Sequence, residues 1–151
     1  MSRAKETRGE GRGPAAGRPE GNGNEKPPDP RRLRGRDGEE IARRYLRRRL
    51  YQIMETNYRS RYGELDIIAR RGNIIAFIEV KARRDKRLGE PYESVGPRKQ
   101  AQIRRMASIW LAEHQHDEKI GDYDFRFDVI SVMLNEEGAA ASIEHIKDAF
   151  Q

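Results

Sequence analysis

The sequence predicts a mixed α/β fold with a central sheet flanked by helices and the element order α-β-β-β-α-β-β. Three observations carry this prediction: an apolar stripe with helical spacing over residues 36–50, an almost continuous β-branched run over residues 74–80, and apolar alternation over residues 123–134. A second helical pattern over residues 97–114 separates the two groups of strands. Helices packed on a sheet of this kind form a layered domain.

The first helix is expected over residues 36–50, and its apolar stripe comprises Ile41, Ala42, Tyr45, Leu46 and Leu50. Residues 51–59 and 63–70 are typical of strands, and Arg71-Gly72-Asn73 is a turn signal before the buried strand at 74–80. Residues 82–95 are expected to form a charged loop. Because the turn is short, the strands at 63–70 and 74–80 should form an antiparallel hairpin.

The second helix should begin at Pro97, since proline suits the first turn of a helix. Its buried face is marked by Ile103, Met106, Ala107, Trp110 and Leu111. A strand at 123–134 follows, and Asn135 to Gly138 form a turn. The last segment, residues 141–150, fits either a short strand or a helix.

Composition divides the chain of 151 residues into two parts. Residues 1–34 hold nine basic and five acidic residues, six of the 14 Gly and five of the 7 Pro. Such a segment cannot bury enough apolar surface to offset its ordering entropy. We therefore expect a disordered basic tail over residues 1–34 and one globular domain over residues 35–151.

Charge is also uneven within the domain. Residues 35–105 hold 19 basic and 10 acidic residues, whereas residues 106–151 hold 3 basic and 10 acidic residues. This polarity indicates a face for an anionic polymer such as nucleic acid, although a solvated helix surface gives the same pattern.

Several classes of protein are excluded by residue content. The absence of cysteine rules out disulfides, thiolate metal sites and a cysteine nucleophile. No apolar run approaches the roughly 20 residues that a membrane helix requires, and the start of the chain has no signal-peptide pattern. We therefore expect a cytoplasmic protein with no membrane partner.

Acidic and basic side chains interrupt two of the predicted strands. Alternation places Glu79 and Lys81 on one face of the strand at 74–80, and Glu64 and Asp66 on one face of its partner. If paired residue numbers sum to 145, Asp66 lies opposite Glu79, and a sum of 143 places Glu64 there instead. In either register the four side chains are expected to share one face.

Neighbouring carboxylates raise each other's pKa, and a divalent cation removes that conflict. Mg²⁺ (or Mn²⁺) takes oxygen ligands, and a lysine beside it can position or activate water for phosphodiester hydrolysis. The alternative is that Glu79 and Lys81 form a salt bridge where the strand reaches solvent. Glu39 lies on the inward stripe of the first helix, so it is either a helix-start acid or a member of the acidic cluster.

Basic residues flank this cluster. Arg59 and Arg61 precede the acidic strand, and Arg83 follows Lys81 in the predicted loop. Lys99 lies on the inward face of the second helix, near its N-terminus, where it could reach a phosphate. These four residues are the candidate nucleic-acid contacts; the alternatives are solvated loop charges and a lysine that extends from the edge of the core.

The motifs resemble the YraN-like family of small bacterial proteins over residues 35–151. The strings that carry the resemblance are Gly35-Arg36-Asp37-Gly38-Glu39, Asn57-Tyr58-Arg59, Gly63-Glu64-Leu65-Asp66-Ile67-Ile68, Phe77-Ile78-Glu79-Val80-Lys81-Ala82-Arg83 and Arg126-Phe127-Asp128-Val129-Ile130. That family is similar to archaeal Holliday junction resolvases, in the restriction-endonuclease-like superfamily. The resemblance implies a nuclease core in which Asp66 and Glu79 are metal ligands, Lys81 positions water, Glu39 is a partner in the metal site and Glu64 is a flanking acid.

The hypothesis with most support is therefore a Mg²⁺- or Mn²⁺-dependent nuclease that acts on DNA, with branched or structured DNA as the narrower expectation. One alternative is a non-catalytic nucleic-acid-binding module that keeps the nuclease fold. Another is an interaction protein whose basic tail docks on an acidic partner. Junction cleavage would suit a homodimer with two active sites.

Overall fold

The computed structural model describes residues 30–84, 95–117 and 119–151. Its elements, in chain order, are α1 (Pro30–Arg48), β1 (Gln52–Ser60), β2 (Gly63–Arg71), β3 (Ile74–Arg83), α2 (Pro97–Glu113), the short 3₁₀ helix η3 (Ile120–Asp122), β4 (Asp124–Leu134) and β5 (Ala140–Phe150). The predicted fold class and element order are confirmed, and the last segment is a strand rather than a helix. Neither α-helix in the described ranges has an apolar stretch long enough to cross a membrane.

The first helix begins earlier than the sequence pattern predicts. It starts at Pro30 rather than at residue 36, and it ends at Arg48 rather than at residue 50. Residues 30–34, which the composition assigns to the tail, belong to α1. Proline is tolerated in the first turn of a helix, where its missing N–H has no partner to lose. The rest of the predicted tail lies outside the described residues.

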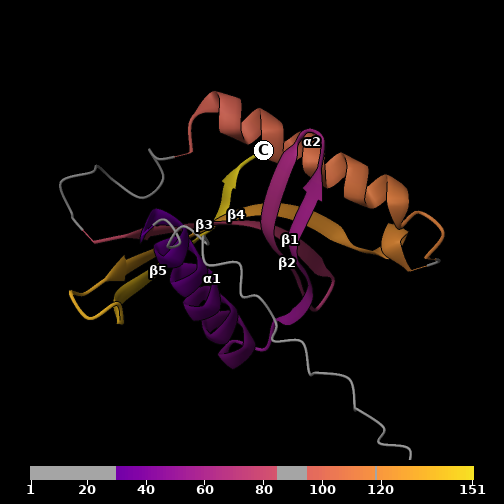
Figure 1. The fold of residues 1–151 in the computed structure, drawn as a ribbon. Coiled ribbons are helices and arrows are strands. Elements are labelled where there is room, and N and C mark those ends of the chain that lie inside the picture. Colours follow the sequence, from indigo (N-terminus) through magenta and orange to yellow (C-terminus); the bar gives the residue numbers. More distant parts are fainter. Residues whose placement is uncertain (1–29, 85–94, 118) are drawn as a thin grey trace, which may run out of the picture.

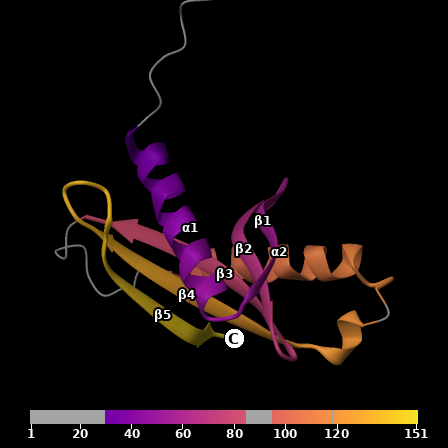
Figure 2. The ribbon, with the colours of Figure 1, turned by 90° about the horizontal axis from the view of Figure 1, so that it is seen from below.

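The five strands form one sheet in the order β1-β2-β3-β4-β5. The β3–β4 pair is parallel, and the other three pairs are antiparallel. Parallel neighbours need a crossover connection, and α2 lies in the segment that joins β3 to β4. Figures 1 and 2 show α1 and α2 on opposite faces of the sheet.

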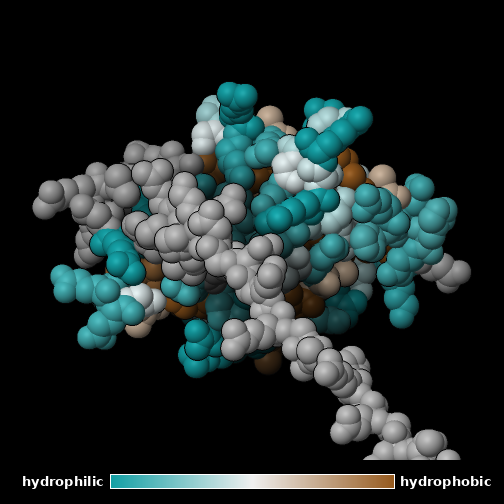
Figure 3. Space-filling view, viewed as in Figure 1, coloured by the Kyte–Doolittle hydropathy of each residue, from teal (hydrophilic) through white to brown (hydrophobic). Residues whose placement is uncertain are grey.

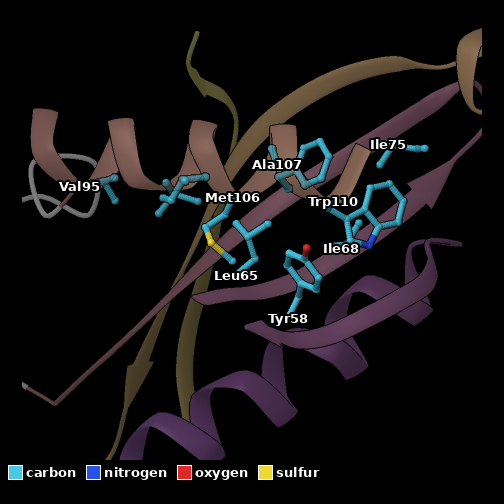
Figure 4. Packing of buried hydrophobic residues seen from close by; sticks show 11 residues of the cluster. Tyr58, Leu65, Ile68, Ile75, Val95, Met106, Ala107 and Trp110 are labelled. Atoms are coloured by element: carbon cyan, nitrogen blue, oxygen red, sulfur yellow. The ribbon is translucent and has the colours of Figure 1, made fainter. Parts of the chain in front are cut away.

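Strand β3 lies at the centre of two apolar clusters. Ile75 and Phe77 face the cluster under α2, whereas Ala76 and Ile78 face the cluster under α1. Figure 4 shows Trp110 and other α2 side chains packed over β2 and β3. A strand buried on both faces explains the continuous apolar run in the sequence. On the face shown in Figure 3, by contrast, the described side chains are mostly hydrophilic.

Two glycines bring the helices close to the strands that carry the acidic residues. A Cβ at Gly38 of α1 would collide with the Cβ of Ala82 in β3. Gly63 has a φ of +144°, and a Cβ there would collide with the side chain of Gln102 in α2. The Gln102 amide also donates to the carbonyl oxygen of Tyr62 at 2.9 Å. Both helices are thereby held against the sheet near Asp66 and Glu79.

Candidate active site

The β2–β3 ladder runs in the register that, continued by one pair, places Asp66 opposite Glu79. The paired positions run from Ile67 with Ile78 to Arg71 with Ile74, which is the register with a sum of 145. Beyond Ile67 the regular ladder stops, and Asp66 Oδ2 accepts a hydrogen bond from the Val80 main-chain N–H at 2.8 Å. The Asp66 side chain therefore bridges from β2 to the main chain of β3 where the two strands separate.

Glu79 is a buried acid with two basic partners. Its side chain is 5% exposed, and its Oε1 atom lies 3.1 Å from Lys81 Nζ and 3.4 Å from Lys99 Nζ. The Oε2 atom is buried, and no described residue forms a hydrogen bond with it. An unpaired buried carboxylate oxygen is costly, so this atom marks a position that favours a positively charged or hydrogen-bonding ligand.

Asp66 carries the electrostatic cost of this arrangement. Burial raises its pKa to about 7, and the negative charges of Glu79 and Glu39 act in the same direction. The hydrogen bond from Val80 and the positive charge of Lys99 only partly oppose that rise. The structure thus brings Asp66, Glu79, Lys81, Lys99 and Glu39 into one electrostatically linked group.

Glu64 does not share a face with Glu79 and Lys81, so that part of the prediction is wrong. Leu65 belongs to the cluster under α2 and Ile67 to the cluster under α1, although strict alternation would place both on one face. Opposite this break, Asn57 has a φ of 52°. The interruption of the pleat turns Glu64 toward the α1 side of the sheet.

Asn57 connects Glu64 to Glu39. With its amide nitrogen directed at the two acids, Asn57 donates to Glu64 Oε1 at 3.0 Å and to Glu39 Oε2 at 3.1 Å. Carboxylates only accept hydrogen bonds when ionised, so this amide orientation is the one that satisfies both. Sequence reasoning did not assign Asn57 to the site; its left-handed conformation, which asparagine tolerates better than most residues, could not be read from strand alternation.

The four predicted nucleic-acid contacts lie in three different places. Lys99 lies within the acidic cluster, whereas Arg59 and Arg61 lie at the β1–β2 turn. Arg59 is 72% exposed and forms an ion pair with Glu64 at 3.3 Å, and the Arg61 guanidinium lies over the Tyr62 ring. Arg83 is half-buried and lies in β3, not in the loop predicted from residue 82. Arg84 of that loop is exposed, and the loop's Lys86 and Arg87 lie outside the described residues.

A second buried polar cluster was also missed. Asp128 is fully buried and accepts hydrogen bonds from Arg126, from His145 Nε2 at 2.8 Å and from the main-chain N–H of Asp148 at 3.0 Å. The sequence feature that could have indicated this cluster is the position of Asp128 between Phe127 and Val129, in a largely apolar strand. This cluster joins β4 to β5, and no contact between described residues connects it to the Asp66–Glu79 pair, so we regard it as structural.

The fold and site together define a small mixed α/β protein with a carboxylate pair, the buried Glu79 and the half-buried Asp66, and two lysines beside it. Residues 38–132 match the model of a family described as "Uncharacterised protein family UPF0102". Relatives designated UPF0102 protein include one from Geotalea uraniireducens, 48% identical over 117 residues, or 78% of this chain and 88% of the relative. Another, from Pelobacter propionicus, is 44% identical over 141 residues, or 91% of this chain and 96% of the relative. The chain belongs to the UPF0102 family, in agreement with the YraN-like resemblance of its motifs.

Proposed function

We propose that this protein is a divalent-metal-dependent nuclease that hydrolyses phosphodiester bonds in DNA. The observation that carries the proposal is the Asp66–Glu79 pair. Glu79 has a buried oxygen that no described residue hydrogen-bonds, and the pKa of Asp66 is raised to about 7 by burial and by its acidic neighbours. A divalent cation is the ligand that relieves both costs at once.

The donor set fits Mg²⁺ or Mn²⁺. Within the described ranges no group of three or more His, Asp or Glu side chains is arranged to hold a metal ion. Mg²⁺ needs only one or two carboxylates, because water and substrate phosphate oxygens complete its coordination. Asp66 and Glu79 would hold the ion, with Glu39 adding negative potential nearby. Such an ion polarises a phosphate and lowers the pKa of bound water.

Lys81 and Lys99 supply positive charge that the proposed hydrolysis requires. Lys81 and Lys99 are 30% and 33% exposed, so each ammonium group contacts the buried Glu79 carboxylate and also faces solvent. A phosphate that approaches the carboxylates would otherwise be repelled. In this proposal Lys81 holds the attacking water and Lys99 contacts a phosphate oxygen. The positive charge of both lysines stabilises the negative charge that develops during hydrolysis.

A non-catalytic nucleic-acid-binding module is the second candidate. It is favoured by the same ion pairs, because Lys81 and Lys99 partly neutralise Glu79 without any metal. Branched or structured DNA is the substrate class that the family resemblance suggests. One cleavage assay tests both whether the protein cleaves DNA or only binds it, and which form of DNA it prefers.

The test is incubation of the full chain with labelled duplex, single-stranded and four-way-junction DNA, with Mg²⁺ or Mn²⁺ or with a chelator. We expect metal-dependent cleavage that is lost in Glu79→Gln and Asp66→Asn. Glu136→Gln is the matched control, since Glu136 is exposed in the β4–β5 turn. DNA binding without cleavage under every metal condition would favour the binding module, and cleavage that survives in Glu79→Gln would refute the assigned site.

A further inference from the structure

A basic groove lies beside the acidic cluster, along the N-terminal half of α2. Its volume is about 690 Å³, and its lining includes Tyr62, Gly96, Arg98, Lys99, Gln102 and Arg105. No acidic residue lines it within the described part of the chain. We call these residues the α2 groove.

The α2 groove opens from the candidate active site. Lys99 belongs to both, because it lines the groove and its Nζ lies 3.4 Å from Glu79 Oε1. From Lys99 to Arg105 the helix rises roughly 9 Å, which matches the axial length of about two to three nucleotides of one strand. A strand cleaved at Glu79 would therefore continue along these basic side chains.

The first turn of α2 adds further donors. Gly96 caps the helix without a side-chain hydrogen bond, Pro97 occupies the first turn, and no acidic residue lies there. The main-chain N–H groups at the start of a helix lack intrahelical partners and attract anions. They reinforce the positive charge of Arg98 and Lys99 at one end of the groove.

Tyr62 supports arginines instead of offering an open ring. The Arg105 guanidinium lies 3.4 Å from the ring centroid and that of Arg61 lies 4.6 Å from it. The Arg61 guanidinium also contacts the Tyr62 hydroxyl. Proteins that stack bases expose aromatic faces, whereas this ring is already used by cations. The groove thus presents positive charge and hydrogen-bond donors, which suit phosphates better than bases.

We infer that the α2 groove binds the sugar–phosphate backbone of the nucleic-acid strand next to the scissile bond, without reading its bases. This inference rests on the proposed function for the position of the scissile bond, but backbone binding itself needs no hydrolysis. Arg98 and Arg105 are the residues that contact phosphate. Tyr62 stacks with Arg105, and Gln102 donates a hydrogen bond to the Tyr62 main chain, so these two residues position Arg105.

The test measures binding of the full chain to fluorescent oligonucleotides by anisotropy, in a chelator, so that no cleavage is required. One oligonucleotide has a mixed sequence, and the other has the same length but carries abasic deoxyribose phosphates. We expect affinities that agree within about threefold, because the shared backbone supplies most contacts. An abasic strand that binds at least about tenfold more weakly would overturn the inference in favour of base stacking.

The variant Arg98→Gln/Arg105→Gln should weaken binding to both oligonucleotides by about tenfold or more. It should also reduce the magnitude of the slope of log K against log salt by about 1.4 to 1.8, because two phosphate contacts are lost. Arg47→Gln/Arg48→Gln is the matched control, since these arginines are exposed on α1. Equal losses in the two double variants would show diffuse charge attraction and overturn the groove as a site. Binding that follows these expectations while cleavage is absent would contradict the nuclease proposal alone.

Discussion

Asp66 Oδ2 accepts a hydrogen bond from the Val80 main-chain N–H at 2.8 Å, at the point where β2 and β3 stop pairing. The side chain takes over the role of a strand acceptor, so the sheet itself fixes the position of this carboxylate. Glu79, the residue before Val80, is held opposite on β3. The distance between the two acids is therefore set by main-chain geometry, and substitutions that keep an acceptor at residue 66 should preserve the fold.

Asp66→Asn should stabilise the protein at neutral and alkaline pH. The pKa of Asp66 is raised to about 7 in the folded state, so the folded protein binds this proton more tightly than the unfolded chain does. The stability that this tighter proton binding provides is fully present below the ordinary pKa of an aspartate, and it is lost as the pH rises through about 7. We expect the variant to gain on the order of 1–3 kcal/mol at pH 8, by urea unfolding. The gain should vanish near pH 4, and a gain that persists unchanged at pH 4 would contradict the role of the raised pKa.

Metal affinity should fall steeply on acidification. A ligand carboxylate must be deprotonated, and Asp66 holds its proton up to about pH 7. Below that pH the apparent affinity for Mn²⁺ should drop by up to about tenfold for each pH unit, by calorimetric titration. Glu136→Gln should show the same profile, whereas Asp66→Asn should bind weakly at every pH. A wild-type affinity that is constant between pH 5 and 8 would exclude Asp66 as a ligand.

Lys81→Met should separate cleavage from binding. The methionine keeps much of the side-chain volume but removes the ammonium group that lies 3.1 Å from Glu79 Oε1. Loss of a group that positions water or stabilises developing charge should lower the cleavage rate by about 100-fold or more. DNA affinity in a chelator should change by only about threefold, because most backbone contacts remain. A cleavage rate near that of the wild type would remove Lys81 from the mechanism.

Periodicity was sufficient to predict the fold, because each apolar pattern here is long and buries a defined face. The β2–β3 hairpin followed from the Arg71-Gly72-Asn73 turn, but its register did not, since both candidate registers oppose the same strand faces. Glu64 was placed wrongly because alternation assumes an unbroken pleat, and the sheet departs from it between Leu65 and Ile67. Such breaks depend on tertiary contacts of Asn57 that no local pattern encodes.

The α2 groove could not be predicted from the sequence, because it also depends on contacts between distant segments. Lys99, Gln102 and Arg105 have helical spacing, but Tyr62 joins them only because the β1–β2 turn packs on α2. The Asp128 cluster likewise depends on pairing between β4 and β5, which brings His145 to Asp128. Residues that are distant in the chain meet at both places, so only the folded structure shows them together.

Asp128→Ala should be strongly destabilising. Burial alone would raise the pKa of Asp128, but hydrogen bonds from His145, Arg126 and the Asp148 main chain outweigh it and hold that pKa below its usual value. Removal of the carboxylate leaves these buried donors unpaired, at a cost of about 3–5 kcal/mol. A lowered pKa gives stability that is present above the ordinary value and lost as pH falls below it. The free energy of unfolding of Asp128→Ala, measured by chemical denaturation, should therefore approach that of the wild type only below about pH 4. Asp122→Ala is the control, because Asp122 is exposed. An equal loss of stability in the two variants would contradict the structural role of Asp128.

Asn57→Asp should destabilise the junction between β1, β2 and α1. The change removes the amide that donates to Glu64 and Glu39 at 3.0 and 3.1 Å and places a third carboxylate between them. Aspartate tolerates the left-handed φ of 52° about as well as asparagine does, so backbone strain is not the cause. We expect a loss of about 1–3 kcal/mol at pH 8 by urea unfolding, because two acceptors lose their donor and like charges meet. The loss should shrink near pH 4, where protonated carboxyls can donate.

Asn57→Gly is the control, because it keeps the backbone conformation but removes the donor without adding charge. Its loss of stability should be smaller and less dependent on pH. Equal losses in the two variants at pH 8 would show that charge repulsion between these acids contributes nothing.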